Sequence, residues 1–182
     1  DKAFDRSKVA SGRNFANKLW NIARFTETLM DKEGEKYFAV SKPEPVSSAD
    51  HWIIREINLA NESISKSMDA DEFGEACARA YDVIWNKLAD WYLEASKKDL
   101  NLSVLTWALE SCLVLAHPFA PFVTEAIWQS LGFRGEESML VTEKLPEVEK
   151  FNDGLALSFD EVAKVTEFAR KVKAVIGAEI EV

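Results

Sequence analysis

The sequence has 182 residues, of which 47% are hydrophobic and 29% are charged, a balance typical of a globular chain long enough to bury one core. Seven glycines and five prolines are too few for a turn-rich chain, and no apolar run reaches the roughly 18 residues of a membrane span, so we expect no membrane partner. A net charge of −9 weighs against unselective binding along a nucleic-acid backbone.

The first predicted helix covers residues 6–30. Its apolar side chains recur every three or four positions and form one stripe that should be buried: Phe15, Leu19, Ile22, Thr26 and Leu29. Residues 31–49 contain one glycine, two prolines and three serines, which indicate a connection rather than a helix.

Three amphipathic helices are predicted next, over residues 49–68, 70–97 and 100–117. Ser47 or Ser48 is the expected N-cap of the first of these helices. In the second, Trp91 lies in phase with its apolar neighbours and should be largely buried. Cys77 and Cys112 also fall at apolar phases, which predicts buried thiols in a reducing compartment and therefore a cytoplasmic protein.

Proline and glycine mark the next boundaries. Pro118 should end the helix before it, because the residue ahead of a proline avoids helical geometry. Pro121 suits the first turn of a short helix that ends near Gly132. His117 lies at this junction, where a role at the helix end is expected rather than catalysis.

The C-terminal part of the sequence is mixed. Residues 133–157 should be extended or irregular, and Ser158 followed by Glu161 predicts a capping box that starts a last helix. Its apolar face is Val162, Val165, Phe168, Ala169, Val172 and Ile176, and Gly177 should end it. The tail AEIEV alternates like the start of a strand, which suggests that the sequence belongs to a longer protein. The predicted fold is an all-α bundle over residues 1–132 with a mixed extension over residues 133–182.

No pattern in the sequence indicates catalysis, a metal site or a cofactor. The glycines are scattered and form no phosphate-binding loop, and cysteine and histidine lack the spacing of a zinc site. The two histidines, His51 and His117, have no evident nucleophile beside them in the sequence.

The stretch RNFANKLWNIARF, residues 13–25, has an unusual polar face. On a helix, Asn14, Lys18, Asn21 and Phe25 form one stripe, and a second stripe beside it contains Arg13, Asn17, Trp20 and Arg24. Residues 1–25 carry a net charge of +4, although the other 157 residues carry −13. Amides, cations and rings on one face suit unpaired bases and phosphates. The alternative is that the rings belong to a wide helix–helix interface and the amides bridge neighbouring helices.

Four segments resemble a known family. GRNFANKLWNIARF (residues 12–25) and AYDVIWNKLADWYLEASK (residues 80–97) are similar to the anticodon-binding domain of the valyl-tRNA synthetases. LVLAHPFAPFVTEAIWQSL (residues 113–131) resembles a helix junction shared by the valyl, isoleucyl and leucyl enzymes. DHWII (residues 50–54) resembles a shorter motif that usually has arginine where His51 stands.

This resemblance implies an all-α domain that binds the anticodon stem-loop of tRNA and accompanies a catalytic domain in the same polypeptide. The parent enzyme would use ATP to join valine to its tRNA, whereas this chain would bind tRNA without catalysis or a cofactor. Lys18 and Phe25 match the family motif as the best anticodon contacts, and an upstream cation, Arg6 or Lys8, should assist. Residues 31–50 are shorter than in the family, so contacts from that loop are not carried over. A helical protein-interaction module, a synthetase paralogue, or the equivalent isoleucyl or leucyl domain are the alternatives.

Overall fold

A computed structural model describes residues 6–34, 42–133 and 138–177. Those residues form helices and connections without a β-strand, so the predicted all-α fold is confirmed. In chain order the elements are α1 (Arg6–Glu33), α2 (Ser48–Asp69), α3 (Phe73–Asp82), η1 (Val83–Tyr92), α4 (Leu93–Ser96), α5 (Leu102–Ala116), α6 (Pro121–Leu131), η2 (Leu140–Thr142) and α7 (Asp153–Ile176).

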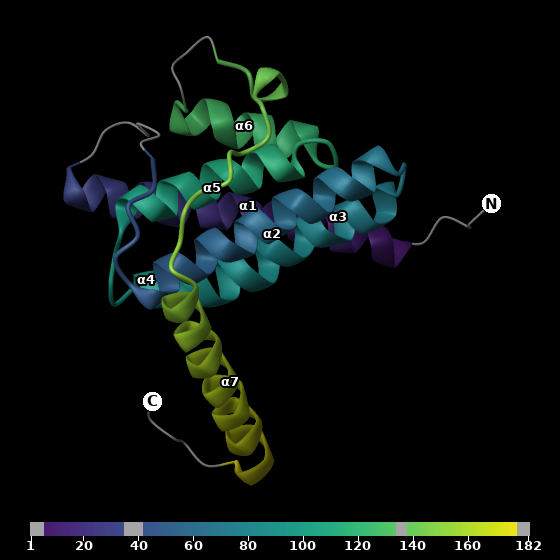
Figure 1. The fold of residues 1–182 in the computed structure, drawn as a ribbon. Helices are drawn as coiled ribbons and strands as arrows, with labels where there is room; N and C mark the ends of the chain where they lie inside the picture. The colour runs from purple at the N-terminus through teal and green to yellow at the C-terminus, as the bar shows by residue number, and fades with distance from the viewer. Residues whose placement is uncertain (1–5, 35–41, 134–137, 178–182) are drawn as a thin grey trace.

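The helices α1 to α6 form a bundle, and α7 leaves one end of it (Figure 1). Within the bundle, α1 and the continuous rod α3–η1–α4 run in the same direction, and α2 lies beside the rod in the opposite direction. The connection after η2 runs back along α2, where the side-chain amide of Asn58 exchanges two hydrogen bonds with the backbone of Glu149, at 2.8 and 3.2 Å. These bonds fix where the chain re-enters the bundle before α7.

The segment predicted as one helix over residues 70–97 contains a wider turn. Residues Val83–Tyr92 form a π-helix, in which the amide of Leu93 bonds to the carbonyl of Leu88, five residues back. This wider turn rotates the side chains away from the regular helical phase. Tyr92 is therefore buried, and Trp91 is partly buried against the core, so Trp91 is less deeply placed than the regular period predicts.

Several predicted boundaries are confirmed, and one is wrong. Ser47 caps α2 and accepts the amide hydrogen of Asp50, whose carboxylate accepts in return the amide hydrogen of Ser47. Pro121 lies in the first turn of α6, and Gly132 and Gly177 take left-handed geometry after α6 and α7. The predicted capping box at Ser158 does not form.

Helix α7 instead begins five residues before Ser158. Asn152 is its N-cap and accepts the amide hydrogen of Leu155 at 3.1 Å, whereas the Ser158 hydroxyl donates to the Leu155 carbonyl at 2.7 Å inside the helix. The backbone amide of Asn152 also donates a hydrogen bond of 3.1 Å to Nδ1 of His51, so this histidine orients the start of α7. An asparagine cap outcompetes the serine because it allows another turn of helix to pack on α2.

The carboxylate of Asp50 joins three parts of the bundle. It is buried and accepts hydrogen bonds from the Tyr92 hydroxyl at 2.7 Å, the Asn101 amide at 2.9 Å and the backbone amide of Val46 at 3.0 Å. Burial, together with this carboxylate, raises the pKa of Tyr92 well above its ordinary value. The motif DHWII and Tyr92 therefore meet in the core, and this contact is structural.

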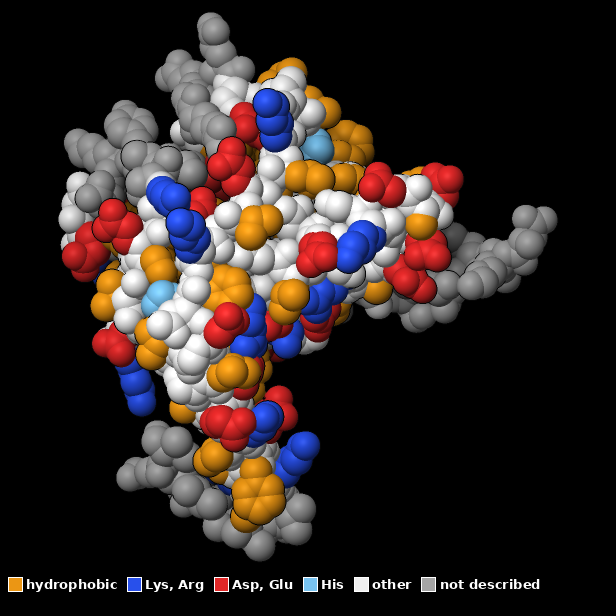
Figure 2. Space-filling model, viewed as in Figure 1, with side chains coloured by type: hydrophobic (Ala, Val, Ile, Leu, Met, Phe, Trp, Pro, Cys, Tyr) orange, Lys and Arg blue, Asp and Glu red, His pale blue; other side chains and the backbone are white. Residues whose placement is uncertain are grey.

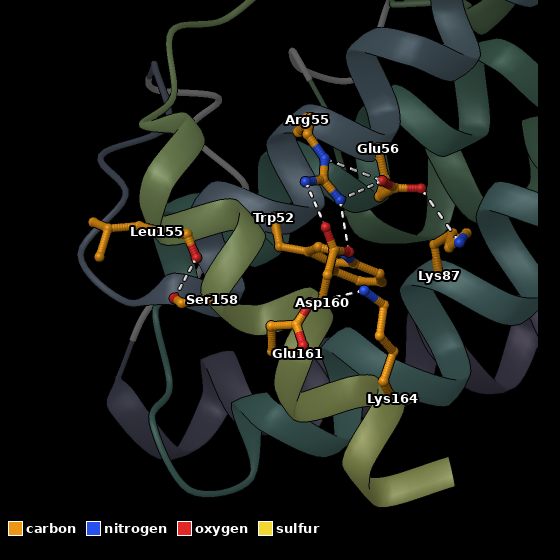
Figure 3. Close-up of polar contacts among 9 residues, drawn as sticks. All are labelled: Trp52, Arg55, Glu56, Lys87, Leu155, Ser158, Asp160, Glu161 and Lys164. Atoms are coloured by element: carbon orange, nitrogen blue, oxygen red, sulfur yellow. Dashed lines mark hydrogen bonds and ion pairs between the residues drawn. The ribbon is translucent and has the colours of Figure 1, made fainter. Parts of the chain in front are cut away.

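A polar network holds the base of α7 against α2 (Figure 3). The Arg55 guanidinium donates two hydrogen bonds of 2.8 Å to the two carboxylate oxygens of Asp160, and the Trp52 indole donates a third of 2.8 Å. Arg55 also contacts Glu56 at 2.9 Å, and Glu56 lies 3.4 Å from Lys87 of η1. The hydrogen bond from Arg55 holds the pKa of Asp160 below its usual value, against the opposing effect of burial.

Beyond this network, three residues of the predicted apolar face of α7 are exposed, whereas Ala169 and Val172 are half-buried and the side chain of Ile176 lies outside the described residues. Val162, Val165 and Phe168 have 56%, 67% and 68% of their surface exposed, and Figure 2 shows hydrophobic side chains along the projecting helix. None of the described helices combines the length and the apolar character that a bilayer crossing needs.

Candidate nucleic-acid interface

Helix α1 buries the stripe that its sequence predicts. Leu19, Ile22 and Thr26 are fully buried, and Phe15 and Leu29 are partly buried. The polar positions predicted to bind RNA point the other way, and those that are exposed are Arg13, Asn14, Asn17, Asn21 and Arg24. The periodicity of α1 therefore predicted correctly which side of the helix faces the bundle.

Three of the predicted contact residues line one hollow between α1 and the rod η1–α4. The hollow has a volume of about 300 Å³, and we call it the α1–η1 groove. Its α1 side is Lys18, Asn21, Ile22 and Phe25, and its other side is Ala89, Leu93, Glu94 and Lys97. Asn14 is exposed one turn before Lys18 on the same stripe.

The floor of the α1–η1 groove is apolar. Ile22, Ala89 and Leu93 are buried beneath it, and the Phe25 ring is partly buried against the core, with part of its surface still open. Polar groups surround this floor: the amide of Asn21 and the ammonium groups of two lysines. A flat apolar surface with donors and acceptors at its edge suits an unpaired base, which has a π-face and a polar rim.

Both lysines of the groove are paired with carboxylates. Lys18 Nζ lies 2.8 Å from Asp90 Oδ1, and Lys97 Nζ lies 2.6 Å from Glu94 Oε1. Sequence reasoning missed the contribution of η1 and α4 because pairing between two helices leaves no local signal. The segment 80–97 was singled out by resemblance, but its side chains were not assigned to the site.

A row of aromatic rings extends from the α1–η1 groove toward the start of α1, between α1 and the rod α3–η1. The centroid of Phe15 lies 5.2 Å from that of Tyr81, and Tyr81 stacks on Trp85 at 5.3 Å. The ammonium group of Lys18 lies 5.1 Å from the centroid of Trp85, which is cation–π distance. Lys18 is therefore held from two sides, by a carboxylate and by a ring.

The second predicted stripe faces a different neighbour. Trp20 and Arg24 line a separate hollow of about 270 Å³ with Ser130 and Leu131 of α6, so they do not share the α1–η1 groove. The Trp20 side chain remains 39% exposed, unlike a ring in a helix–helix interface. Arg6 and Lys8 lie in the first turns of α1, but their side chains fall outside the described residues.

Larger hollows elsewhere in the described chain have more carboxylates than cations. A hollow of about 740 Å³ near the start of α2 is lined by Glu33, Glu44, Asp50 and Asp99 against one cation, Lys98. Another of about 580 Å³ lies under the connection to α7 and includes Glu110, Glu143, Glu147 and Glu149 against Lys42 and Lys144. A polyanion is repelled from both, so the α1–η1 groove is a better candidate than either of them. Among the described residues no cluster of three or more histidines, cysteines or carboxylates could hold a metal ion.

The pattern of a known family matches residues 50–180, and this family is the anticodon-binding domain of tRNA ligases. The chain belongs to this family. Valine–tRNA ligase of Anoxybacillus flavithermus is 34% identical over 190 residues, which cover 99% of this chain and 22% of that protein. Valine–tRNA ligase of Bacillus cereus is 40% identical over 146 residues, covering 75% of this chain and 16% of the relative.

A further valine–tRNA ligase, from Staphylococcus carnosus, is 36% identical over 193 residues and covers 100% of this chain and 21% of its own length. The chain thus spans about a fifth of the length of the curated relatives that it matches. The resemblance to the anticodon-binding domain of the valyl enzymes is confirmed. The match to the domain family begins at residue 50, after α1, whereas the alignments that cover 99% and 100% of the chain include α1 and its groove residues.

Proposed function

We propose that this chain is the anticodon-recognising, tRNA-binding part of a valine–tRNA ligase. Its substrate is the anticodon stem-loop, and the α1–η1 groove receives an unpaired base of the loop. The parent polypeptide joins valine to tRNA with ATP in a separate catalytic domain, and it does so in the cytoplasm. The observation that carries the proposal is that Lys18, Asn21 and Phe25 line one groove with an apolar floor.

The contacts in the groove support a division of roles. Phe25 offers a partly open ring on which a base can stack, and Asn21 can both donate to and accept from a base edge. Lys18 supplies a cation on the same face, about 10 Å from Phe25 along the helix axis, since the two residues are seven positions apart. Arg13, Asn14 and Asn17 lie on the same exposed side and would contact the loop or its backbone.

We infer further that the helical part, residues 1–132, contains the RNA-binding surface and that residues 133–182 form a separate extension of it. Arg24 and Trp20 would contact RNA beside the groove, and Arg6 or Lys8 would reach the stem. The catalytic domain of the same polypeptide would pack elsewhere on the bundle.

A helical protein-interaction module is the second candidate. It is favoured by the apolar side chains that α7 exposes, chiefly Val162, Val165 and Phe168. This candidate predicts binding of a protein through α7 and no preference for any RNA. A direct RNA-binding measurement therefore separates the two candidates.

The test is Phe25→Ala, with RNA binding and thermal unfolding measured on the same samples. Against an anticodon stem-loop RNA with a valine anticodon, the variant should lose about 1–3 kcal/mol of binding if a base stacks on the ring. The dependence of the affinity on salt should stay the same, because no charge is removed. Phe122→Ala is the matched control, since that ring is 91% exposed on α6, away from the groove.

A second RNA, with an abasic site at each anticodon position in turn, locates the stacked base. Phe25→Ala should cost nothing further on the RNA that lacks this base, because the contact is already gone. If Phe25→Ala lowers thermal stability while the folded protein binds all the RNAs as before, the ring belongs to the core and the groove is not the RNA site.

A further inference from the structure

Lys18, one of the two cations that line the α1–η1 groove, already has a partner. The Asp90 carboxylate accepts a hydrogen bond of 2.8 Å from Lys18 Nζ, and the Trp85 ring lies 5.1 Å away on another side. The side chains of Lys18 and Asp90 are 30% and 44% exposed, so both are accessible to solvent, and Asp90 borders the groove through its contact with Lys18 rather than lining it. A lysine without a partner attracts any phosphate, but this lysine has a carboxylate in contact.

Asp90 makes the rim of the groove unfavourable for phosphate. A phosphate close enough to contact Lys18 would lie about 6 Å from the Asp90 carboxylate, and two like charges at that distance weaken binding about 3- to 10-fold when the effective dielectric constant lies between that of water and about half of it. The pair Lys97–Glu94 repeats the arrangement one turn further on, with an ammonium–carboxylate distance of 2.6 Å. The two lysines therefore add little net positive charge to the groove.

An unpaired base meets different conditions at the same place. An ammonium group has three hydrogen-bond donors, so Lys18 can keep its bond to Asp90 and still donate to an acceptor atom on a base edge. A neutral base is not repelled by Asp90 and gains contact with the apolar floor formed by Ile22, Ala89 and Leu93. The fixed pair also holds the ammonium in one position, which favours hydrogen bonding in one geometry.

We propose that Asp90 is a positioning and specificity residue of the RNA groove. It commits Lys18 to a base edge and prevents this lysine from serving as a general phosphate contact. This inference rests on the proposed function, because it assumes that the α1–η1 groove receives a base of the anticodon loop.

The test is Asp90→Asn in the 182-residue chain, because asparagine keeps an oxygen acceptor and the shape but removes the charge. Two RNAs are compared: the valine anticodon stem-loop and an unstructured single strand of the same length. The variant should bind the single strand about 3- to 10-fold more tightly, with a salt slope steeper by about 0.7 for one added phosphate contact. Its affinity for the stem-loop should stay the same or fall, so the ratio of the two affinities decreases.

Three further variants link the effect to Lys18 and to the charge of Asp90. In a Lys18→Met background, Asp90→Asn should no longer increase the affinity for the single strand, since there is no ammonium group to free from its pair with Asp90. Asp82→Asn removes a carboxylate from the same helical rod that pairs with Arg79 at 2.8 Å rather than with Lys18, so it should leave the affinity ratio unchanged. Asp90→Glu keeps the charge and should retain the selectivity of the parent chain.

The outcomes separate this inference from the proposed function. If the parent chain binds both RNAs equally, the proposed function is refuted and the inference falls with it. If the parent chain discriminates and Asp90→Asn discriminates equally well, the inference alone is wrong. A lower melting temperature with an unchanged ratio assigns Asp90 a purely structural role and also overturns the inference.

Discussion

The contact between Arg55 and Asp160 should decide whether α7 stays on the bundle. Asp160→Asn removes the charge and replaces one acceptor oxygen with a donor that faces the guanidinium, so one of the two 2.8 Å bonds is lost. The Asp160 and Arg55 side chains are 28% and 15% exposed, which makes the pair stronger than a surface ion pair. Arg55 retains its ion pair with Glu56, at 2.9 Å, so its guanidinium is not left without a carboxylate partner. We therefore expect a loss of about 2 kcal/mol in the free energy that holds α7.

Hydrogen exchange of the backbone amides measures this loss directly. Amides in α7 should exchange faster in Asp160→Asn, by about 30-fold for 2 kcal/mol at 1.4 kcal/mol per tenfold change, while the amides of α5 stay as protected as in the parent. Glu161→Gln is the matched control, because it removes a neighbouring charge whose pair with Lys164 is 71% and 70% exposed. Unchanged exchange in α7 of the Asp160 variant would refute the assignment of this pair as the anchor.

The same pair should make the attachment of α7 sensitive to acid. The pKa of Asp160 is lowered in the folded protein, first by the hydrogen bond from Arg55 and also by that from Trp52, so the folded protein favours the ionised form. The stabilisation is present above the unfolded pKa, about 4, and is lost as the pH falls through the lower folded pKa. The exchange difference between the parent and Asp160→Asn should therefore narrow below about pH 4, whereas a constant difference would contradict this account.

Two further predictions concern burial. Trp91→Ala should cost about 2 kcal/mol in urea unfolding, since the ring is only partly buried beside Phe159, whereas Trp128→Ala, at a site 1% exposed, should cost about 3–5 kcal/mol. Equal losses would contradict the phase shift in η1. A thiol reagent should modify Cys77 in the native chain but reach Cys112 only after unfolding, because Cys112 is buried and burial raises the pKa of its thiol; two equally fast thiols would contradict the fold.

The elements that follow a regular period were predictable from the sequence. The stripe of α1 has a spacing of three and four, and Leu19, Ile22 and Thr26 at its centre are buried as predicted, whereas Phe15 and Leu29 at its ends are partly buried. The starts of α2 and α6 were also predictable, because Ser47 and Pro121 act through local hydrogen bonding and backbone geometry. Such signals need no knowledge of the neighbouring helices.

The errors occur where packing overrides the local pattern. A regular 3.6-residue period cannot represent the π-helical turn of η1, so it overestimated the burial of Trp91 and could not indicate that Tyr92 would meet Asp50. Cys77 was predicted to be buried and is exposed, because α3 buries a narrow stripe through Ala76 and Ala80 and Cys77 lies beside it. At α7 the asparagine cap and the serine are both good local signals, and only packing on α2 decides between them.

The candidate site was predictable on one side only. Lys18, Asn21 and Phe25 lie together on α1 because of their spacing, which a sequence shows, but Glu94 and Lys97 reach the groove from another helix. The roles of these residues stay predictions, since binding is what the proposed experiments measure. Asp90 could not be identified from the sequence because a carboxylate in an amphipathic helix usually faces water.

The acidic character of the chain is consistent with selective RNA binding. A chain with a net charge of −9 repels a nucleic-acid backbone over most of its surface, and on the face seen in Figure 2 the described acidic and basic side chains are interspersed. Binding energy must then come from a few contacts at one place, where a base can be buried. A site whose lysines are paired with Asp90 and Glu94 extends the same principle to the groove itself. Weak attraction for the backbone leaves the fit of the base to decide which RNA stays bound.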